Sequence, residues 1–565
     1  MRLIECVPNF SEGRDLNKIR LITNAIESVD GITLLDVDPG SDTNRTVVTF
    51  VGSPEIIAEA AFQGIKTASE QIDMSKHKGA HPRMGATDVC PLVPVSNVTK
   101  DECIIIAKLL AERVGNELNI PVYLYEDSAQ TLERKNLSLI REGEYEGLSS
   151  KIIKSEWKPD FGPSEFNSRS GATVIGVRDF LIAYNINLNT RDERLATDIA
   201  FELRESGRSK RIPNPDSPNL LDGEIVRTKD GKPVKVPGLF KDLKGVGWYL
   251  PELMRAQISL NFNNYNESTL HHVFDKACVL AQERGVRVTG SELVGLVPME
   301  AMLMAGRHYL TKQRYTKGIP LNDIIEVAIQ SLGLNDIVPF NTEEKIIENA
   351  VKNSSNKLMS LKSDDFINEL STNSAAPGGG SVSALAGSLG AALISMVSAL
   401  NHEKKENIKI KPQMEKIGIE AQKIKDRLSF LVDEDTNAFN QLIKANRMPS
   451  SNNKQEKEKL NAIQKANEFA IEIPLEVISH CLRIIELSED LIDNGNPNLV
   501  SDAGVSAEVS LAGVRGAAMN VLINLIGIDD DSYCNKKREL VNKFINDAEK
   551  NWKIVFDKTM KKIIL

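Results

Sequence analysis

The pattern of apolar residues changes once along this chain, near residues 341–356, and that change limits the folds that the chain can adopt. Before it, short alternating segments typical of strands recur between segments with helical periodicity; after it, strand patterns nearly vanish and helical segments follow one another. The polar stretch NTEEKIIENAVKNSSN between them predicts a helical connector that ends in a linker. A chain of 565 residues is also too long for a single hydrophobic core. We therefore expect several packing units of two different classes.

The first part of the chain predicts two successive α+β subdomains, each a mixed sheet with helices, and the last part an all-α helical bundle. In the first subdomain we expect strands at residues 32–38, 45–51, 87–95 and 121–125 and helices at 17–28, 54–72 and 99–118. In the second we expect strands at 180–188, 255–262 and 286–294 and helices at 191–205 and 269–283. Residues 208–237, rich in Pro, Asn, Asp, Lys and Gly, predict a surface loop or small hairpin. The expected division is 1–178, 179–333, a connector at 334–356, and the bundle at 357–565.

Composition excludes several classes of protein. Hydrophobic residues make up 41% and charged residues 26%, which disfavours a disordered, collagen-like or multi-span membrane protein. Lys and Arg total 69 against 78 Asp and Glu, a formal charge of -9. Nucleic-acid binding usually needs a basic surface, so no nucleic-acid partner is expected. Local basic pockets for small anions remain compatible with this balance.

The cysteines and the two ends of the chain favour a cytoplasmic location. The 6 Cys include no C-x-x-C pair, which in a long chain is typical of reduced thiols rather than of disulfides or a zinc site. Glu5 and Pro8 interrupt the apolar run that a signal peptide would need. The terminal KKIIL carries no prenylation or retention motif.

Residues 382–400 are uncharged and long enough to span a bilayer. The segment is rich in Ser, Ala and Gly, so its hydrophobicity is modest. Gly387, Ala391 and Ser395 recur at four-residue spacing, which allows helices to pack closely. We expect a buried helix of the bundle and no transmembrane segment.

The densest polar cluster of the first half is HKGAHPRMGATD, which begins at His77 and contains His81 and Arg83. Gly79 and Pro82 oppose a helix that would present both imidazoles to one zinc ion, and no third ligand has suitable spacing, so no metal site is expected. A histidine of ordinary pKa can act as a general base near neutral pH, and an arginine can hold a carboxylate through two hydrogen bonds. The alternative is a loop histidine that hydrogen-bonds to the backbone.

Three glycine-rich segments are candidate ligand loops. GPSEFNSRSG, from Gly162 to Gly171, and PGLFKDLKGVG, from residue 237 to 247, predict loops whose backbone can approach a flat ligand, with Lys241 and Lys244 supplying charge for carboxylates. APGGGS precedes the small-residue helix and can offer free N–H groups to an anion or a polar ring. None matches a P-loop or dinucleotide motif, and ordinary turns are the alternative.

One carboxylate interrupts an apolar helix seam in the second half. Residues 414, 417, 421, 424, 428, 431, 435, 438 and 442 follow three- and four-residue steps and are apolar except for Asp435. Burial should raise the pKa of that carboxyl from about 3.9, so that it can exchange protons near neutral pH. The alternative is an aspartate paired with a buried cation or a backbone donor.

Longer motifs resemble a known family. IECVPNFSEGRD, LLDVDPGSDTNRTVVTFVG, HKGAHPRMGATDVCPLVPV, FGPSEF and GSELVGLVP are similar to the formiminotransferase half of the formiminotransferase-cyclodeaminases, and SAAPGGGSV, LVDEDTNAF and MNVLINL to the cyclodeaminase half. The likeness runs nearly end to end. Two departures are a longer loop at residues 211–236 and Leu239 where a basic residue is expected.

The resemblance implies two reactions of histidine breakdown. The formimino group moves from formiminoglutamate to nitrogen 5 of tetrahydrofolate, releasing glutamate, and 5-formiminotetrahydrofolate then cyclises to 5,10-methenyltetrahydrofolate, releasing ammonia. It assigns His81 as the transferase base and Asp435 as the cyclodeaminase acid/base. The expected substrate- and folate-binding residues are Arg45, Arg83, Gly162, Pro163, Ser164, Gly171, Gly238, Lys241, Lys244, Gly245, Gly247, Gly378, Gly379, Gly380 and Ser381.

The resemblance also implies partners and assembly. Tetrahydrofolate, polyglutamylated, is a co-substrate retained between the sites, no metal is required, and the subunits form a homo-oligomer that is a ring of dimers. Two other hypotheses remain open: a transferase whose helical part serves assembly, and a folate-binding scaffold without turnover.

Overall fold

The computed structural model describes residues 2–352, 358–374, 376–404 and 408–564. Its internal contacts divide the chain into two compact units. The first consists of Met1–Met304 and Leu332–Asn353, and the second of Ala305–Ser331 and Ser354–Leu565. Each unit is described by itself.

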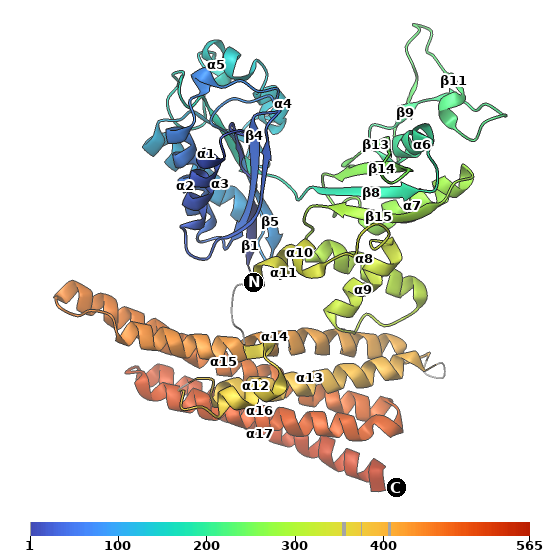
Figure 1. The fold of residues 1–565 in the computed structure, drawn as a ribbon. Helices are drawn as coiled ribbons and strands as arrows, with labels where there is room; N and C mark the ends of the chain where they lie inside the picture. The colour runs from blue at the N-terminus through green and yellow to red at the C-terminus, as the bar shows by residue number, and fades with distance from the viewer. Residues whose placement is uncertain (1, 353–357, 375, 405–407, 565) are drawn as a thin grey trace. The chain divides into compact units, whose positions relative to one another are not determined.

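The first unit begins with a seven-stranded mixed sheet, shown in blue in Figure 1. Its strands are β1 (Leu3–Cys6), β2 (Asn9–Phe10), β3 (Thr33–Gly40), β4 (Arg45–Gly52), β5 (Thr87–Ser96), β6 (Val122–Glu126) and β7 (Thr173–Val177). The spatial order is β1-β4-β2-β5-β7-β6, with β3 on the outer side of β4 and β1 also paired with β5. Strands β5, β7 and β6 run parallel, and the other pairs are antiparallel.

One face of this sheet carries the apolar core. Helices α1 (Leu16–Glu27), α2 (Ile57–Gln71) and α3 (Lys100–Leu118) cover it. Side chains alternate along β4, so Val48 and Phe50 are fully buried beneath these helices, while Arg45, Val47 and Thr49 belong to the opposite face. Polar residues are therefore concentrated on the face that α1–α3 leave free.

Short helices lie between the strands in sequence, and those between β6 and β7 cover part of that second face. They are η1 (Met74–Lys76), η2 (Leu132–Lys135), α4 (Leu137–Ile140), α5 (Glu144–Lys151) and η3 (Ser155–Trp157). Ile140, Leu148 and Ile152 pack there against Tyr123 and Tyr125 of β6.

A second sheet of four antiparallel strands lies in the same unit, in the order β13-β14-β8-β15. Its strands are β8 (Ile182–Leu188), β13 (Leu243–Leu250), β14 (Arg255–Phe262) and β15 (Val288–Val294), and it packs against α6 (Glu193–Leu203) and α7 (Leu270–Glu283). Residues 208–237 form two small two-stranded ladders, β9 (Arg208–Ser209) with β12 (Lys235–Val236) and β10 (Arg211–Ile212) with β11 (Glu224–Ile225). The short helix η4 (Leu220–Asp222) lies between β10 and β11. Of the two predicted forms, a surface loop or a small hairpin, the structure has short hairpin ladders.

Among the described residues, five helical segments connect the second sheet to the bundle in sequence. They are α8 (Met299–Gln313), α9 (Leu321–Leu332), α10 (Thr342–Lys345), α11 (Ile347–Lys352) and η5 (Leu358–Ser360). The boundary between the two units lies inside α8. The predicted connector is helical up to residue 352, and the end of the linker expected after it lies outside the described residues.

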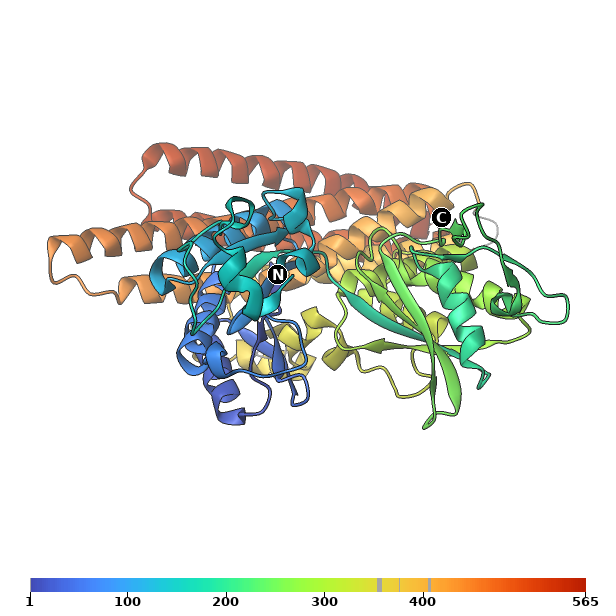
Figure 2. The same ribbon diagram turned by 90° about the horizontal axis from the view of Figure 1, so that it is seen from above.

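The second unit is a bundle of long helices, which run side by side in both views (Figures 1 and 2). Besides most of α8 and α9, its elements are α12 (Ser363–Leu370), α13 (Gly379–Glu403), α14 (Lys411–Asn446), α15 (Asn453–Asn494), η7 (Pro497–Leu499), α16 (Val500–Asn524), η8 (Leu525–Gly527) and α17 (Asp531–Ile564). The expected mixed-sheet part and all-helical part are both confirmed.

Helix α13 packs against α14, α15 and α16 through its small residues. A Cβ atom at Gly387 would lie 2.5 Å from Cys481 Sγ, so only glycine permits this approach. In the described part of the chain, two helical segments are long and apolar enough to cross a membrane, Gly379–Glu403 and Pro497–Gly527. In the most apolar stretch of each, 56% and 44% of the stretch, respectively, is buried inside the protein. Close packing of α13 within the bundle accounts for its apolar sequence, as a core helix requires.

Candidate active sites

His81 lies in the loop between η1 and β5, and Asp88 holds this loop in place. The buried carboxylate of Asp88 accepts a hydrogen bond from the backbone N–H of Met84, 2.9 Å away, and forms an ion pair with Arg141. The backbone of Gly85 also bridges to Gly171. These contacts fix the backbone directly after His81.

The surroundings of His81 disfavour protonation of its imidazole. Arg45, the first residue of β4, lies within hydrogen-bond distance of His81 Nε2. A guanidinium only donates, so Nε2 must carry the lone pair and Nδ1 the proton. Burial lowers the pKa of His81, and the positive charges of Arg45 and Arg141 lower it further. Among the described residues, the buried Nδ1 has no hydrogen-bond partner.

His77 and Arg83 both form contacts within this chain. His77 Nε2 lies 3.0 Å from the backbone oxygen of Asn44, to which it donates, and Nδ1 accepts from Arg83 Nε at 3.3 Å. Both ring nitrogens are thus occupied within the protein.

Arg83, which was predicted to hold a substrate carboxylate, is paired with carboxylates of its own chain, and its contact with substrate stays a prediction. Its guanidinium is 7% exposed and forms two hydrogen bonds, of 2.9 and 2.7 Å, with the carboxylate of Glu146, and a third of 2.9 Å with Glu144. The paired geometry is as expected, but the carboxylate belongs to α5 of the same chain. Sequence reasoning did not find these partners because they lie 61 and 63 residues away.

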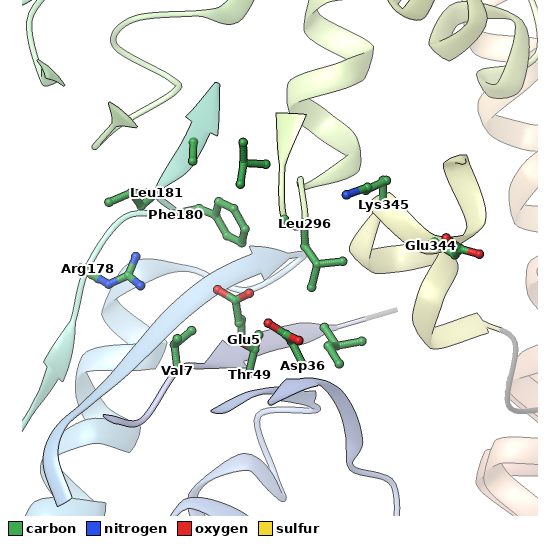
Figure 3. Close-up of a pocket in the computed structure, with 14 residues that line it drawn as sticks. Glu5, Val7, Asp36, Thr49, Arg178, Phe180, Leu181, Leu296, Glu344 and Lys345 are labelled. Carbon is green, nitrogen blue, oxygen red and sulfur yellow. The ribbon is translucent and has the colours of Figure 1, made fainter. Parts of the chain in front are cut away.

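The polar face of the first sheet continues from Arg45 to a cavity of about 470 Å³. Cross-strand pairing places Asp38 and Asp36 of β3 beside Val47 and Thr49 of β4, on the same face as Arg45. Figure 3 shows Glu5 and Asp36 turned into the cavity, with the ring of Phe180 opposite them. Sequence reasoning missed both Arg141 and this cavity.

The first glycine-rich loop supports the His81 loop through its last residue. Gly171 has φ +67°, and a Cβ atom there would lie 2.1 Å from the backbone oxygen of Met84. Gly162 has φ +80°, and a Cβ atom there would lie 2.4 Å from the backbone oxygen of Ile120. Pro163 is half-buried and Ser164 exposed. Contact of Pro163 and Ser164 with folate stays a prediction.

The second glycine-rich segment is only partly a loop, which corrects the prediction. Gly238 and Lys241 precede β13, but Lys244, Gly245 and Gly247 lie within it, paired with β14. A Cβ atom at Gly247 would lie 2.1 Å from the backbone nitrogen of Thr197, so this glycine allows α6 to approach the strand. Glycines that serve helix–sheet packing were taken for turn residues. Lys244 is exposed and close enough to Glu126 to lower that carboxyl's pKa, although burial raises it more.

The bundle brings Asp435 of α14 against the start of α13. Ser381 Oγ lies 3.0 Å from Asp435 Oδ2 and 3.0 Å from the backbone oxygen of Val432. A Cβ atom at Gly380 would lie 2.0 Å from Asp435 Oδ1, so glycine is required for this approach. Two segments that the sequence indicated separately, residues 378–381 and Asp435, therefore form one cluster.

Burial raises the pKa of Asp435, whereas the hydroxyl and the backbone N–H of Ser381 lower it. Burial is the larger effect, so the carboxyl is suited to exchanging protons closer to neutral pH. Asn520 of α16 lies beside this cluster, since a Cβ atom at Gly379 would be 3.5 Å from its Nδ2. Asn520 was not predicted as a site residue, although it belongs to the motif MNVLINL.

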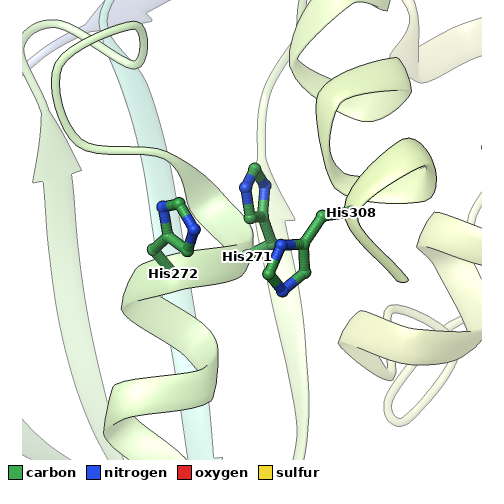
Figure 4. A group of neighbouring side chains, drawn as sticks. All are labelled: His271, His272 and His308. Carbon is green, nitrogen blue, oxygen red and sulfur yellow. The ribbon is translucent and has the colours of Figure 1, made fainter. Parts of the chain in front are cut away.

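Histidines also occur at the start of α7, away from the predicted sites. The rings of His271 and His272 have centroids 4.4 Å apart, and both lie within hydrogen-bond distance of Thr269 Oγ1 (Figure 4). The expectation that no metal is needed stays a prediction.

Comparisons with known proteins cover nearly the whole chain. Family models match at residues 3–178 (formiminotransferase domain, N-terminal subdomain), 183–352 (formiminotransferase domain) and 362–543 (formiminotransferase-cyclodeaminase). Formimidoyltransferase-cyclodeaminase of Mus musculus is 40% identical over 97% of this chain and 97% of that protein. Glutamate formimidoyltransferase of Streptococcus pyogenes serotype M1 is 40% identical over 55% of this chain and 93% of that protein. A solved structure, formiminotetrahydrofolate cyclodeaminase of Thermotoga maritima, is 26% identical and covers 37% of this chain and 100% of that chain, with a TM-score of 0.34.

Proposed function

Because the chain belongs to the formiminotransferase-cyclodeaminase family, we propose that it is a bifunctional folate enzyme of histidine degradation. It transfers the formimino group of formiminoglutamate to nitrogen 5 of tetrahydrofolate and then converts 5-formiminotetrahydrofolate to 5,10-methenyltetrahydrofolate and ammonia. The observation that carries this proposal is the likeness to a bifunctional relative over 97% of both chains, which includes both halves.

In the transferase step, His81 acts as the base. Nitrogen 5 of the folate attacks the formimino carbon and loses its proton to Nε2 of the neutral imidazole, which Arg45 releases when it turns to a substrate carboxylate, so that a tetrahedral intermediate forms. The bond from that carbon to the glutamate nitrogen then breaks, and the proton leaves on the departing amine. Burial and the charges of Arg45 and Arg141 support this role because they keep the imidazole unprotonated.

Arg45 suits the anionic substrate, whereas Arg141 is already paired with Asp88. Formiminoglutamate carries two carboxylates, and an arginine binds a carboxylate through paired hydrogen bonds. Both guanidinium groups lie close enough to His81 to affect its pKa, and a bound carboxylate would offset their charge.

In the second step, Asp435 exchanges protons with the folate. Nitrogen 10 attacks the formimino carbon while the neutral carboxyl of Asp435 protonates the formimino nitrogen. The resulting carboxylate takes the proton of nitrogen 10 and passes it to the same amine, which leaves as ammonia. The raised pKa of this carboxyl supports the role, because an acid that is neutral for part of the time can donate. The free N–H groups at the start of α13 suit a polar folate ring beside it.

We extend the proposal to substrate form, assembly and location. The folate is polyglutamylated, no metal takes part, and the protein is a cytoplasmic homo-oligomer arranged as a ring of dimers. Exposed apolar side chains on the bundle support assembly, among them Leu389 at 55%, Met519 at 69% and Ile526 at 76% exposure. Free cysteines support a reducing compartment. The boundaries at residues 178, 333 and 356 remain our proposed domain division.

The test is an assay of purified protein supplied with formiminoglutamate and tetrahydrofolate. Glutamate, ammonia and the absorbance of methenyltetrahydrofolate are followed together, and all three should form in equal amounts. His81→Ala should abolish glutamate release and still convert supplied 5-formiminotetrahydrofolate, whereas Asp435→Asn should accumulate that intermediate. Glutamate without ammonia would favour a transferase whose bundle serves assembly. Folate binding without either product would favour a scaffold.

A further inference from the structure

The carboxyl of Asp435 lies at the N-terminus of a helix other than its own. Helix α13 begins at Gly379, and Gly378, at its N-cap position, has no side chain that could accept from the first-turn N–H groups. Asp435 of α14 lies there instead and accepts a hydrogen bond from the backbone N–H of Ser381. Unpaired amides and the helix dipole favour a negative charge at this end of a helix. The start of α13 therefore stabilises the ionised form of a carboxyl that burial would keep neutral.

The hydroxyl of Ser381 has two acceptors at equal distance. Its Oγ lies 3.0 Å from Oδ2 of Asp435 and 3.0 Å from the backbone oxygen of Val432. Oγ carries one hydrogen, so the hydroxyl donates to one of them at a time. In the described residues the remaining neighbour of Oγ is the hydroxyl of Thr436, at 3.4 Å. Because Ser381 is fully buried, the direction of its hydroxyl depends on the protonation state of Asp435.

Within the described residues, no charged side chain holds Asp435 in one protonation state. Burial raises its pKa, and the hydroxyl and backbone N–H of Ser381 lower it. Helix α13 carries no charged residue between Gly379 and Leu400. Charged residues on the other helices packed here are Asp433 and Glu434 of α14, Glu472 and Glu476 of α15, which pair with Lys537 and Arg427, and Arg515 of α16, which pairs with Glu549. None of these charges contributes to the shift in the pKa of Asp435.

We propose that Ser381 is a positioning residue for the second reaction, whose hydroxyl donates to Asp435 when the carboxyl is ionised and to the backbone oxygen of Val432 when the carboxyl is neutral. This proposal rests on the proposed function, because it takes Asp435 as the acid and base of cyclisation. The hydrogen stays on Oγ throughout, and only its direction changes.

The second reaction needs both forms of Asp435. The neutral carboxyl protonates the formimino nitrogen, and the carboxylate that results takes the proton of nitrogen 10. A cation in place of Ser381 would hold Asp435 ionised, and an apolar side chain would leave its pKa raised by burial. A hydroxyl with a second acceptor stabilises the carboxylate as it forms and still has a hydrogen bond when the carboxyl is neutral. Ser381 therefore acts on the folate through Asp435.

The test is the pH dependence of kcat for supplied 5-formiminotetrahydrofolate, measured with the full-length wild type and Ser381→Ala after subtraction of the enzyme-free rate. Alanine removes the donor, so the pKa of Asp435 rises further. The basic limb of the profile should shift to higher pH by about one to two units, the equivalent of one charge-assisted hydrogen bond. Below that limb kcat should fall roughly 10- to 100-fold, because the carboxylate formed in the reaction loses a donor, whereas KM should change by less than about threefold.

Two further variants separate this role from general damage. Ser381→Cys, whose thiol is a weaker donor, should shift the basic limb by less than Ser381→Ala does. Ser383→Ala is the matched control, because the hydroxyl of Ser383 is buried on the same helix but donates to the backbone oxygen of Gly379, 2.7 Å away, and the limb should stay in place. A fall in kcat of Ser381→Ala with an unmoved limb would show a merely structural role and overturn the proposal, as would a shift to lower pH.

Thermal unfolding tests the same contact without turnover. A carboxyl with a raised folded-state pKa loses stability as the pH rises through that value, and loss of the donor raises it further. Ser381→Ala should therefore lower the Tm more at pH 8 than at pH 5, whereas in the Asp435→Asn background its effect should be the same at both. Equal effects at the two pH values in the wild-type background would contradict the proposal. If the wild type does not convert 5-formiminotetrahydrofolate, the proposed function fails, and the Tm comparison still decides whether the hydroxyl responds to Asp435. If the wild type converts it and neither the limb nor the Tm responds, only this inference fails.

Discussion

Arg45 donates a hydrogen bond to Nε2 of His81, so a permanent cation faces the proposed base of the transferase step. Two effects follow from one contact. The ring is oriented, and its protonation is opposed, because an imidazolium would then lie beside the guanidinium. The neutral form, which is the form that can accept a proton, is thereby retained at lower pH.

Replacing Arg45 by Met should shift the acidic limb of the transferase pH profile to higher pH. Loss of the positive charge raises the pKa of His81, so a smaller fraction of the base is neutral at a given pH and kcat/KM falls most below pH 7. The measurement is kcat/KM for formiminoglutamate from pH 5.5 to 8.5. Arg45→Lys, which keeps the charge, should show a smaller shift, and Arg20→Met on exposed α1 should show none. A shift of the acidic limb to lower pH in Arg45→Met would contradict this electrostatic role.

Gly380→Ala should inactivate the second reaction without affecting the first. The new Cβ atom would lie 2.0 Å from Asp435 Oδ1, so α13 or the carboxyl must shift by about an ångström. A displacement of that size is expected to lower the cyclodeaminase kcat roughly 100-fold. Gly379→Ala is the comparison, since its Cβ atom makes only an ordinary contact of 3.5 Å with Asn520. Equal losses in the two variants would show that the approach of Asp435 to Gly380 is not what matters.

Asp435→Asn should stabilise the protein while it abolishes cyclisation. Burial raises the folded-state pKa of Asp435 above its ordinary 3.8, so the folded state disfavours the ionised form. Its contribution to the unfolding free energy is therefore highest below pH 3.8 and declines as the pH rises through the raised value. At pH 7.5 the neutral amide avoids this penalty, and calorimetry should record a higher Tm for the variant than for the wild type. At pH 4 the difference should be smaller, and a lower Tm at pH 7.5 would contradict the argument.

Local elements were predictable because their signals lie close together in sequence. Helix α3 begins after Thr99, whose side chain and that of Glu102 form a capping box, and strand β14 has the bounds that its alternation indicated. The seam around Asp435 was likewise visible, since one turn of helix places its residues on one face. These predictions needed no knowledge of the tertiary structure.

What could not be predicted depends on contacts between distant segments. The closeness of Ser381 to Asp435, 54 residues away, arises only when α13 packs on α14. In the sequence, Glu5 was only a residue that interrupts an apolar run. The alternation of apolar and polar residues along a strand does not show whether an acidic side chain is buried or exposed. Gly247 was taken for a turn residue, since its packing partner Thr197 is far away in sequence.

A variant of Glu146 tests whether Arg83 anchors α5 or holds the substrate. If the guanidinium of Arg83 serves to anchor α5, Glu146→Gln should weaken that anchor and cost about 0.5–1 kcal/mol, a fall in Tm of roughly 1–4 °C, because Glu146 is largely exposed and Glu144 keeps its ion pair with Arg83. The transferase kcat should fall as well, because Arg83 is two residues from His81, whereas the KM for formiminoglutamate should change little. Were Arg83 a substrate ligand, freeing it from Glu146 would lower that KM and leave kcat intact. Thermal unfolding and steady-state kinetics on Glu146→Gln, with exposed Glu133→Gln as the control, distinguish the two roles.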